Sequence, residues 1–508
     1  MKRYTRLLVA AALVAVAATA AASTSTHRAA AALPLPHPTV SDYQFVSASE
    51  TPPTEAQCES ADAGSRTCFT PQAIQSAYNL GPLYARGLDG TGMTIAIVDS
   101  YGSDTMAHDL HVFNQAFGLR SMCGEEGVTC RPGMPRFSEL SLQGSPATKA
   151  QPGNGTHQED KSAWALEVAL DVETSHAIAP GANILLVHTN TAETLGVQGF
   201  PQMMMAEDYV VKNHLADVIS QSFASAEDAF GSPQSLQNLR YAYVDAKANG
   251  VTVLGSSGDD GTANARKTPV AQGGSTIPEP TVEWPASDPL VTGVGGTYLC
   301  TDPLATTNQP RTTYAKPGVG AKCGSSKYNP GGKFAEVAWT FSGGGFSHIF
   351  DRPTWQSTLP AGSSFAGSTR GVPDVAFQAS AATGALVYLS LPPDGQSGLS
   401  CGAGPCSTGW YDIGGTSLSC PQWAGIVAIA DQLNGGRLGF INPALYRIGA
   451  DPARYAADFY DVASGNTNQA ADGIDGYPAT QGWDAVTGLG TPNAANLVPD
   501  LVRAAHGM

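Results

Sequence analysis

The sequence carries little charge, and basic residues are especially few. Only 14% of its 508 residues are charged, with 27 Lys and Arg against 43 Asp and Glu and a formal net charge of −16. Nucleic acids and anionic membrane surfaces attract basic proteins, so this balance argues against both as partners. The apolar fraction of 42% is that of a globular chain, and the length allows a large buried core.

Long apolar runs are also missing, with one exception near the start of the chain. Residues 7–22 are apolar and follow Lys2, Arg3 and Arg6, and small residues continue to Ala32. A basic start, an apolar stretch and small residues at its end are typical of a secretory signal peptide. The sequence therefore predicts a signal peptide over residues 1–32 and a secreted, extracellular protein with no membrane association once that segment is removed.

Cysteine is scarce, but its spacing suits an oxidising compartment. Eight of the nine cysteines stand near one another in pairs, and we expect four local disulfides. Cys420 is left over, and we interpret it as a small buried hydrophobe rather than a reactive thiol. The expected pairs are Cys58–Cys68, Cys123–Cys130, Cys300–Cys323 and Cys401–Cys406.

The chain after the signal peptide divides into two parts. Residues 33–66 are rich in Pro, Ser, Thr and Ala and read as a short linker or pro-segment, whereas residues 67–508 form one patterned domain without internal repeats. Short β-branched runs alternate there with helical patterns, which favours an α/β fold with a mostly parallel central sheet and helices on both faces. We expect strands at 93–98, 183–187, 218–223, 251–254 and 290–294, helices at 72–78, 107–117, 162–174, 236–248 and 418–433, and a loop-rich stretch from 265 to 410.

One candidate nucleophile stands near the end of the chain. The segment 414–421 reads Gly-Gly-Thr-Ser-Leu-Ser-Cys-Pro and leads into an apolar run, the pattern of a loop that feeds a buried helix. Ser417 would then lie at a helix N-terminus, where free N–H groups and the positive end of the helix dipole favour an anion. That position suits a nucleophile whose substrate develops an oxyanion.

The expected helix at 162–174 carries two acidic residues on one face. Glu167 and Asp171 are four residues apart, and all side chains between residues 163 and 170 except that of Glu167 are apolar. Two carboxyls on a mostly buried face cannot both ionise cheaply, so one pKa rises and the pair shares a proton. Such a pair suits a general base that works at acidic pH.

A third carboxyl follows a strand. Residues 251–254 run into the turn Gly-Ser-Ser-Gly-Asp-Asp-Gly, which places Asp259 just beyond the strand end. A turn aspartate that binds its own backbone is the ordinary interpretation. The functional alternative is a protonated carboxyl that donates to an oxyanion.

Together, in this order, these patterns are similar to the sedolisin family of serine-carboxyl peptidases, which includes the kumamolisins and tripeptidyl-peptidase I. The resemblance rests on Glu-x-x-x-Asp at 167–171, Ser-Gly-Asp at 257–259 and Gly-Thr-Ser-x-x-x-Pro at 415–421. It extends to Ser-Gln-Ser-Phe at 220–223, Trp-Pro-Ala-Ser at 284–287, Gly-Val-Gly-Gly-Thr at 293–297, Ser-Gly-Gly-Gly-Phe-Ser at 342–347 and Pro-Asp-Val at 373–375.

The resemblance implies a subtilisin-like fold and a serine-type endopeptidase that hydrolyses protein or peptide substrates at acidic pH. It makes Ser417 the nucleophile that forms an acyl-enzyme, Glu167 the general base, Asp171 its proton-sharing partner and Asp259 the oxyanion donor. Tripeptidyl-peptidase activity also occurs in the family and stays open as an alternative. A monomer is expected.

The C-terminal part adds an expected structural calcium ion. Asp461 and Asp484 can supply carboxylates, and Val462, Thr480 and Gly482 can supply carbonyls, the oxygen ligands that Ca²⁺ prefers. The resemblance implies one Ca²⁺ at this segment, where Gly-Trp-Asp-Ala-Val-Thr-Gly-Leu-Gly stands at 482–490.

Three departures from the family pattern leave alternatives open. The segment 33–66 is too short to form a stable prodomain unaided, so a non-catalytic secreted binding protein on a peptidase scaffold is one alternative. Ala224 stands where the family often has Gly, on a strand expected to line the substrate cleft. Finally, Asp99 follows the first strand as in subtilisins, so a neutral enzyme that uses Asp99, His157 and Ser417 is the other alternative.

Overall fold

An eight-stranded sheet forms the centre of the fold. The strand order is β11-β10-β8-β6-β3-β5-β4, and β14 also pairs with β10. Every pairing in this sheet is parallel except that of β10 with β11. The strands are β3 (Thr94–Ser100), β4 (Phe137–Leu142), β5 (Asn183–Thr189), β6 (Val218–Gln221), β8 (Thr252–Ser256), β10 (Thr292–Leu299), β11 (Glu336–Ala338) and β14 (Val375–Gln378).

The structure is a computed structural model, and its described residues belong to one compact unit that starts at Ala32. It describes residues 37–38, 42–61, 66–142, 158–189, 199–265, 276–303, 306, 329, 334–392, 397–401, 404–465, 468 and 473–508. The expected signal peptide over residues 1–32 lies outside them.

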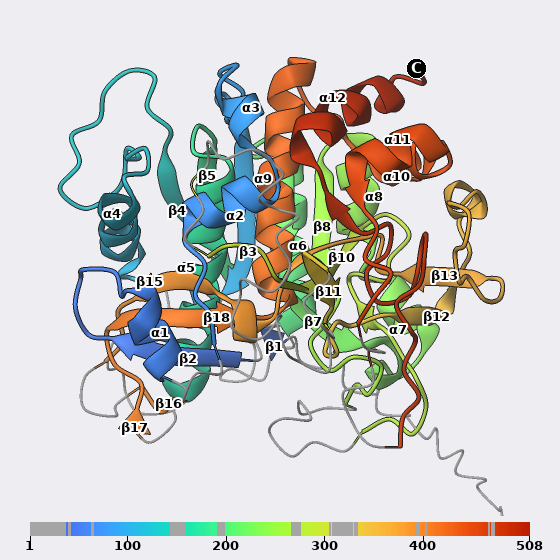
Figure 1. Ribbon diagram of the computed structural model, residues 1–508, viewed down its shortest axis with the longest axis horizontal. Helices are drawn as coiled ribbons and strands as arrows, with labels where there is room; N and C mark the ends of the chain where they lie inside the picture. The colour runs from blue at the N-terminus through green and yellow to red at the C-terminus, as the bar shows by residue number, and fades with distance from the viewer. Residues whose placement is uncertain are drawn as a thin grey trace, which may run out of the picture. The chain divides into compact units, whose positions relative to one another are not determined.

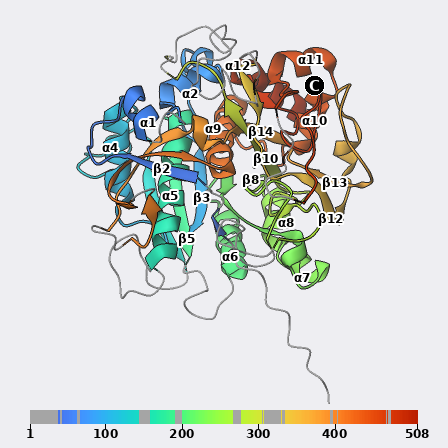
Figure 2. The same ribbon diagram turned by 60° about the horizontal axis from the view of Figure 1, so that its bottom comes forward.

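Helices cover both faces of the sheet because its strands alternate apolar side chains between two cores. Along β3, Ile95 and Ile97 enter the core that holds α5 (Gln158–Ile178) and α9 (Thr416–Asn434), whereas Ala96 and Val98 enter the core that holds α6 (Gly199–Lys212) and α8 (Tyr241–Ala248). Figures 1 and 2 show α6 and α8 across the strands from α9 and α12. The predicted α/β architecture, with a mostly parallel sheet and helices on both faces, is confirmed.

The other elements surround this sheet. The remaining helices are α1 (Glu55–Ala61), α2 (Pro71–Ala77), α3 (Gly81–Tyr84), α4 (Met106–Phe117), α7 (Pro233–Gln237), α10 (Asn442–Gly449), α11 (Pro452–Asp458) and α12 (Ala494–Ala505). The remaining strands are β1 (His37–Pro38), β2 (Asp42–Ser47), β7 (Phe223–Ala226), β9 (Glu283–Trp284), β12 (Gly345–Asp351), β13 (Thr369–Val372), β15 (Ala385–Leu389), β16 (Ser400–Cys401), β17 (Gly404–Pro405), β18 (Gly409–Gly414), β19 (Phe459–Tyr460) and β20 (Thr491–Pro492).

Two local expectations differ from the structure. The helix expected at 236–248 is split, because tight turns in which Leu239 N donates to Leu236 O and Arg240 N to Gln237 O interrupt the chain between α7 and α8. The stretch from 265 to 410, expected to be rich in loops, contains the strands β9–β17, most of them too short to leave a clear pattern. Part of the segment 33–66 forms β1, β2 and α1.

The cysteines follow the expected local pairing. Disulfides join Cys58 to Cys68, Cys123 to Cys130 and Cys401 to Cys406. Cys300 is also disulfide-bonded, and its expected partner Cys323 lies outside the described residues. Cys420 is free and buried, as predicted.

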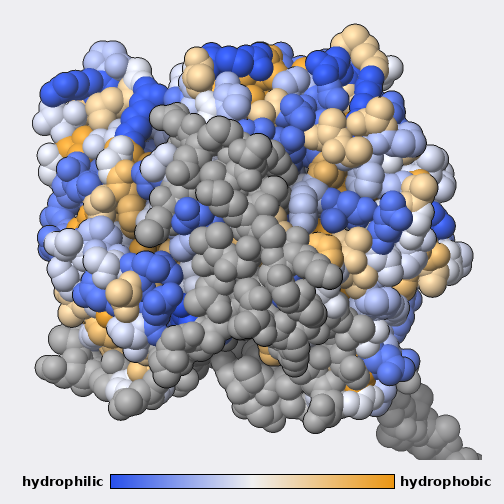
Figure 3. All heavy atoms as spheres, in the orientation of Figure 1, coloured by the Kyte–Doolittle hydropathy of each residue, from blue (hydrophilic) through white to orange (hydrophobic). Residues whose placement is uncertain are grey.

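Polar and apolar residues alternate over the visible face of the molecule. Figure 3 shows hydrophilic residues distributed among smaller apolar areas there. Among the helices that the structure describes, none has both the length and the apolar character needed to cross a membrane.

Candidate active site

Ser417 lies in the first turn of α9 and is buried. The helix begins after Gly415, whose φ of 130° is in the region that favours glycine. Gly415 N donates to Ala379 O, which fixes the backbone just before the helix. The structure therefore places Ser417 at a helix N-terminus, where the sequence predicted it.

Asp259 lies directly beside that helix start. It follows β8, and its Oδ1 accepts hydrogen bonds from Thr416 N at 2.7 Å and from Thr416 Oγ1 at 2.8 Å. Gly258 N in turn donates to Thr416 Oγ1 at 3.1 Å. Asp259 thus binds the residue that immediately precedes Ser417, and two loops distant in the sequence form one unit.

The helix that carries the acidic pair packs against α9. Gly425 of α9 permits this close contact, because a Cβ there would lie 2.7 Å from the side chain of Ile178 on α5. Ser175 Oγ of α5 donates to Pro421 O at 3.3 Å. The packing brings the face of α5 with Glu167 and Asp171, both fully buried, toward the first turns of α9.

Electrostatic effects on Cys420 locate the acidic pair more closely. Cys420 is one turn after Ser417, and burial is the main cause that raises the pKa of its thiol. The carboxyls of Asp171 and Glu167 raise the pKa of Cys420 further. Both carboxyls therefore lie within electrostatic range of the helix turn that begins with Ser417.

Three buried carboxyls form a coupled cluster. Burial, followed by the neighbouring carboxyls of Asp99 and Glu167, raises the pKa of Asp171 well above its usual range. Ser222 Oγ donates to Asp171 Oδ1 at 3.0 Å and lowers that pKa. Burial also raises the pKa of Asp99 to about 8. Such a cluster holds protons into the neutral range.

Two neighbours of the acidic pair, Asp99 and Ser222, were not predicted to lie beside it, and Asp99 was expected to act only in the neutral alternative. Asp99 is the next-to-last residue of β3, and Ser222 directly follows β6. β3 and β6 are parallel neighbours, so their carboxyl ends lie at one edge of the sheet. A polar residue at the end of a buried strand is the signal that could have identified both. Asp99 lies among carboxyls, while His157, its partner in the neutral alternative, lies outside the described residues.

The expected calcium ligands surround one turn. Gly482 N donates to both carboxylate oxygens of Asp461 at 3.1–3.2 Å, and Thr480 N donates to Asp484 Oδ2 at 2.9 Å. Burial raises the pKa of Asp484 to about 7 and also raises the pKa of Asp461. Val462 is buried and directly follows Asp461.

Neither Asp461 nor Asp484 forms an ion pair with a described basic residue. In the part of the chain that the structure covers, no group of three or more His, Cys, Asp and Glu side chains is arranged to hold a metal ion. The expected ligand set contains only two such side chains, and its other members are backbone carbonyls.

Comparisons with known proteins agree with this geometry. A family model described as the subtilase family matches residues 90–444. The chain is 30% identical over 454 residues to kumamolisin from Bacillus sp. (strain MN-32), covering 89% of this chain and 66% of kumamolisin. It is 30% identical over 408 residues to sedolisin from Pseudomonas sp. (strain 101), covering 80% of this chain and 57% of sedolisin.

Two further matches support the same grouping. Tripeptidyl-peptidase 1 from Homo sapiens is 29% identical over 365 residues, which cover 68% of this chain and 53% of that protein. The chain therefore spans only about half to two thirds of these relatives' lengths. A solved structure of Pseudomonas sedolisin, a serine-carboxyl proteinase complexed with pseudo-iodotyrostatin, matches with a TM-score of 0.58 and 25% identity over 85% of this chain and 97% of that one. The predicted subtilisin-like fold is thus confirmed, and the chain belongs to the subtilase family and, within it, to the sedolisin family.

Proposed function

We propose that this protein is a serine-carboxyl endopeptidase that hydrolyses proteins and peptides at acidic pH. The observation that carries the proposal is that carboxyl side chains from two separate parts of the chain lie near the first turn of α9. Asp259 binds Thr416 from one side, and Glu167 and Asp171 on α5 lie within electrostatic range of Cys420. A serine at a helix start, with carboxyls around it, is equipped for acyl transfer.

The reaction follows from these roles. Ser417 Oγ attacks the peptide carbonyl while Glu167 accepts its proton, and the tetrahedral intermediate expels the amine, which takes a proton from Glu167. Water then attacks the acyl-enzyme by the same route and releases the acid. Asp171 shares a proton with Glu167, and the hydroxyl of Ser222 holds the Asp171 carboxyl in place.

Asp259 is proposed to stabilise the oxyanion. Both donors of Thr416 bind one oxygen of its carboxyl, Oδ1, as a carbonyl oxygen would accept them. The proton of the neutral acid is then carried by Oδ2, which can donate it to the developing negative charge. The backbone N–H of Ser417 at the helix start would add a second donor.

The acidic working range follows from the buried cluster. A carboxylate base must be partly ionised to accept a proton, and an acid that stabilises an oxyanion must be protonated. Burial raises the pKa of Asp99 to about 8, and burial together with the carboxyls of Asp99 and Glu167 raises the pKa of Asp171 well above its usual range. Both conditions can be met together only at acidic to mildly acidic pH.

Strand β7 is the proposed binding edge for an extended substrate. Phe223 and Ala224 of β7 already pair antiparallel with Pro38 and His37 of β1, and β1 also contacts α5. Because β1 and β9 both pair with β7, an extended peptide would add to β7 beside the helix that carries Glu167 by replacing β1. Because Ala224 replaces the usual glycine there, its methyl group would reduce the room for a substrate side chain.

We further propose one structural Ca²⁺ at the turn around Gly482. Two carboxylates, those of Asp461 and Asp484, lie at the same short segment without a described basic partner, and burial disfavours their negative charge, which a bound cation would offset. Carbonyls of Val462, Thr480 and Gly482 would complete an oxygen shell. Bound Ca²⁺ would neutralise the two carboxylates and stabilise this part of the fold.

Secretion is also part of the proposal. Its support is the basic and apolar start of the sequence together with the three described disulfides, which form in oxidising compartments. A monomer acting outside the cell is the expected state.

The test is a pH–activity profile on a denatured protein substrate, for the wild type and for Glu167→Gln. We expect an acidic optimum for the wild type and loss of turnover in the variant at every pH. An optimum near neutrality that disappears in His157→Ala would favour the neutral alternative. Absence of turnover at any pH in the wild type would favour the non-catalytic one.

A further inference from the structure

The residues just before the catalytic domain are built into it as an edge strand. We call residues 42–61 and 66–68 the N-terminal arm. Its strand β2 pairs antiparallel with β18, in a small sheet whose order is β15-β18-β2, so β18 is the central strand. The register places Asp42 opposite Gly414, the last residue of β18. Ser417 follows three residues later.

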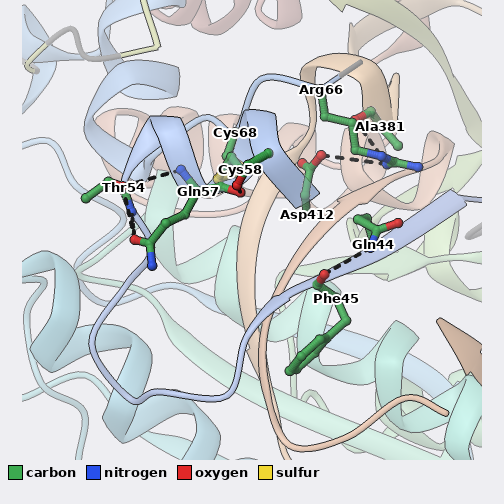
Figure 4. Close-up of a disulfide and its surroundings, with 10 residues drawn as sticks. Gln44, Phe45, Thr54, Gln57, Cys58, Arg66, Cys68, Ala381 and Asp412 are labelled. Atoms are coloured by element: carbon green, nitrogen blue, oxygen red, sulfur yellow. Dashed lines mark hydrogen bonds and ion pairs between the residues drawn. A yellow bond between two sulfur atoms is a disulfide. The ribbon is translucent and has the colours of Figure 1, made fainter. Parts of the chain in front are cut away.

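Arg66 binds β2 within the arm and connects the arm to two other segments. Its Nη2 donates to Asp42 Oδ1 of β2 at 2.6 Å, and its Nη1 donates to Ala381 O at 3.3 Å and lies 3.7 Å from Asp412 Oδ2 of β18. Figure 4 shows the Arg66 side chain reaching toward Asp412 and Ala381, beside the disulfide of the arm. The Arg66 side chain is only 10% exposed, and that of Asp412 is fully buried.

Arg66 faces a buried carboxyl. Burial raises the pKa of Asp412, which lies inside a strand, well above its usual range, and the positive charge of Arg66 opposes this effect. Without Arg66, the carboxyls of Asp42 and Asp412 would share the strand pair with no described cation between them. The carboxyl of Glu55 on α1 also repels Asp412, so Arg66 is the part of the arm that compensates the charge of Asp412.

The arm is anchored at its second end as well. The disulfide between Cys58 and Cys68 joins α1 to the chain just before the domain, and both cysteines are buried. Thr67 N donates to Ala382 O and Phe69 N donates to Gly384 O, so the backbone after Arg66 is bound to the loop that precedes β15. A cut anywhere between Cys58 and Cys68 would still leave β2 covalently attached.

Accepting the proposed peptidase function, on which this inference rests, we propose that the N-terminal arm is a permanent positioning element for the nucleophile. It holds β18, the strand that leads directly into Gly415, Thr416 and Ser417, and Arg66 is its positioning residue. Proteolytic maturation then removes residues only upstream of Asp42. The arm is thus not a disposable pro-segment, although it lies within residues 33–66.

The physical reason is the short stretch of chain between the residues that the arm holds and the Ser417 hydroxyl. Gly414 pairs with Asp42 of β2 and packs closely against the backbone of Ala381. A Cβ on Gly414 would lie 2.2 Å from Ala381 N. A shift of β18 is therefore transmitted to Ser417 over three residues. Misplacement of a nucleophile by about 1 Å can lower turnover about 100-fold without removing any catalytic group.

The first experiment identifies the N-terminus of the active, secreted enzyme. We expect intact mass and N-terminal sequencing, done after reduction, to show a chain or disulfide-linked fragment that begins upstream of Asp42. A fully active enzyme whose protein begins at or after Phe69, with no linked arm, would overturn the proposal.

The second experiment compares Arg66→Gln with Arg437→Gln in the full-length protein. Arg437 makes a similar, partly buried ion pair with Asp217 at 2.7 Å, near the other end of α9. At a temperature where both variants are folded, we expect kcat to fall about 10- to 100-fold in Arg66→Gln with KM nearly unchanged, and labelling of Ser417 by a peptide aldehyde to slow in parallel. Arg437→Gln should leave kcat within about twofold.

A double variant separates positioning from folding. Arg66→Gln with Asp412→Asn removes the buried charge together with its partner, so we expect much of the lost kcat to return. Unchanged kcat in folded Arg66→Gln, or a loss of thermal stability alone, would overturn the arm proposal while wild-type turnover upholds the peptidase. If the wild type has no turnover at any pH, the proposed function itself fails and the arm proposal falls with it.

Discussion

The hydroxyl of Ser222 donates a hydrogen bond of 3.0 Å to Asp171 Oδ1, and both groups are fully buried. Ser222 comes from the segment between β6 and β7, whereas Asp171 lies on α5. The bond favours the ionised form of a carboxyl whose pKa is raised first by burial and then by Asp99 and Glu167. The Ser222 hydroxyl therefore lowers the pKa of Asp171, whereas burial and the two neighbouring carboxyls raise it.

Ser222→Ala is expected to move the acidic limb of the pH profile of kcat/KM to higher pH, by about one unit. The hydroxyl stabilises the ionised Asp171 carboxyl, and a hydrogen bond to a charged group contributes about 1.5–3 kcal/mol. Without it, a higher pH is needed to ionise the coupled pair. Ser220→Ala is the control, since its hydroxyl contacts Cys420 at 3.4 Å rather than a carboxyl. An unchanged limb in Ser222→Ala would contradict a base that includes Asp171.

Ser417→Ala is expected to lower kcat by about 10⁴-fold or more, because the change removes the proposed nucleophile. Folding should be unaffected, since the change removes one oxygen from a buried position. Kinetics on a denatured protein at the acidic optimum, together with thermal melting, measure the two effects. Substantial residual cleavage by a correctly folded variant would show that Ser417 is not the nucleophile.

The local part of the candidate site could be predicted from the sequence. Glu167 and Asp171 share a helix face by spacing alone, and Asp259 and Ser417 follow a strand and precede a helix, respectively. These signals depend on residues a few positions apart. The contacts of Asp171 with Ser222 and Asp99 could not be predicted in this way, because they depend on β6 lying next to β3 in the sheet.

The same limit applies to the fold. The sequence predicts α9 to within two residues of its observed bounds and also predicts the centre of α5, which extends four residues further at each end than expected. Pairing of β2 with β18 leaves no local signal, since the two strands stand at opposite ends of the chain. Composition alone made residues 33–66 resemble a linker, whereas β2 is held by its partner strand and by Arg66.

Asp259→Ala is expected to lower kcat by about 10²- to 10³-fold, the usual effect of losing one oxyanion donor. Asp259→Asn should lose less, because its amide keeps an N–H donor at every pH, and its activity should extend to higher pH than that of the wild type. Rates across the pH range for both variants measure this. Equal losses in both variants, with unchanged pH profiles, would point to a role in holding Thr416 alone.

Removal of calcium is expected to lower the melting temperature. Burial disfavours the negative charges of Asp461 and Asp484, and removing the cation would remove the positive charge that offsets that effect. Melting with and without a chelator, for the wild type and Asp461→Asn, gives the measurement, and the variant should lose most of its response to calcium. Asp475→Asn, an exposed change in the same segment, serves as the control. An equal melting temperature with and without the chelator would exclude a bound stabilising ion.

The free energy of unfolding depends on pH through the buried carboxyl of Asp431. Asp431 of α9 is buried, its Oδ1 accepts a hydrogen bond from Leu438 N at 2.8 Å, and burial raises its pKa from 3.8 to about 8. The folded protein therefore holds a proton that the unfolded chain releases between about pH 4 and about pH 8, so the free energy of unfolding falls as the pH rises through that window.

Asp431→Asn keeps the acceptor for Leu438 and removes the charge, so we expect it to raise the melting temperature by a few degrees near neutral pH. Well below the unfolded pKa both side chains are neutral, and the difference should vanish there. Exposed Asp104→Asn controls for the general change in net charge. Because Glu55, Asp109 and Asp458 are also carboxyls whose pKa burial raises, to between about 6 and about 7, the same sign applies to each, and their sum favours a protein most stable in acid. A gain in Asp431→Asn that persists unchanged in strong acid would mean that packing, rather than proton binding, is its cause.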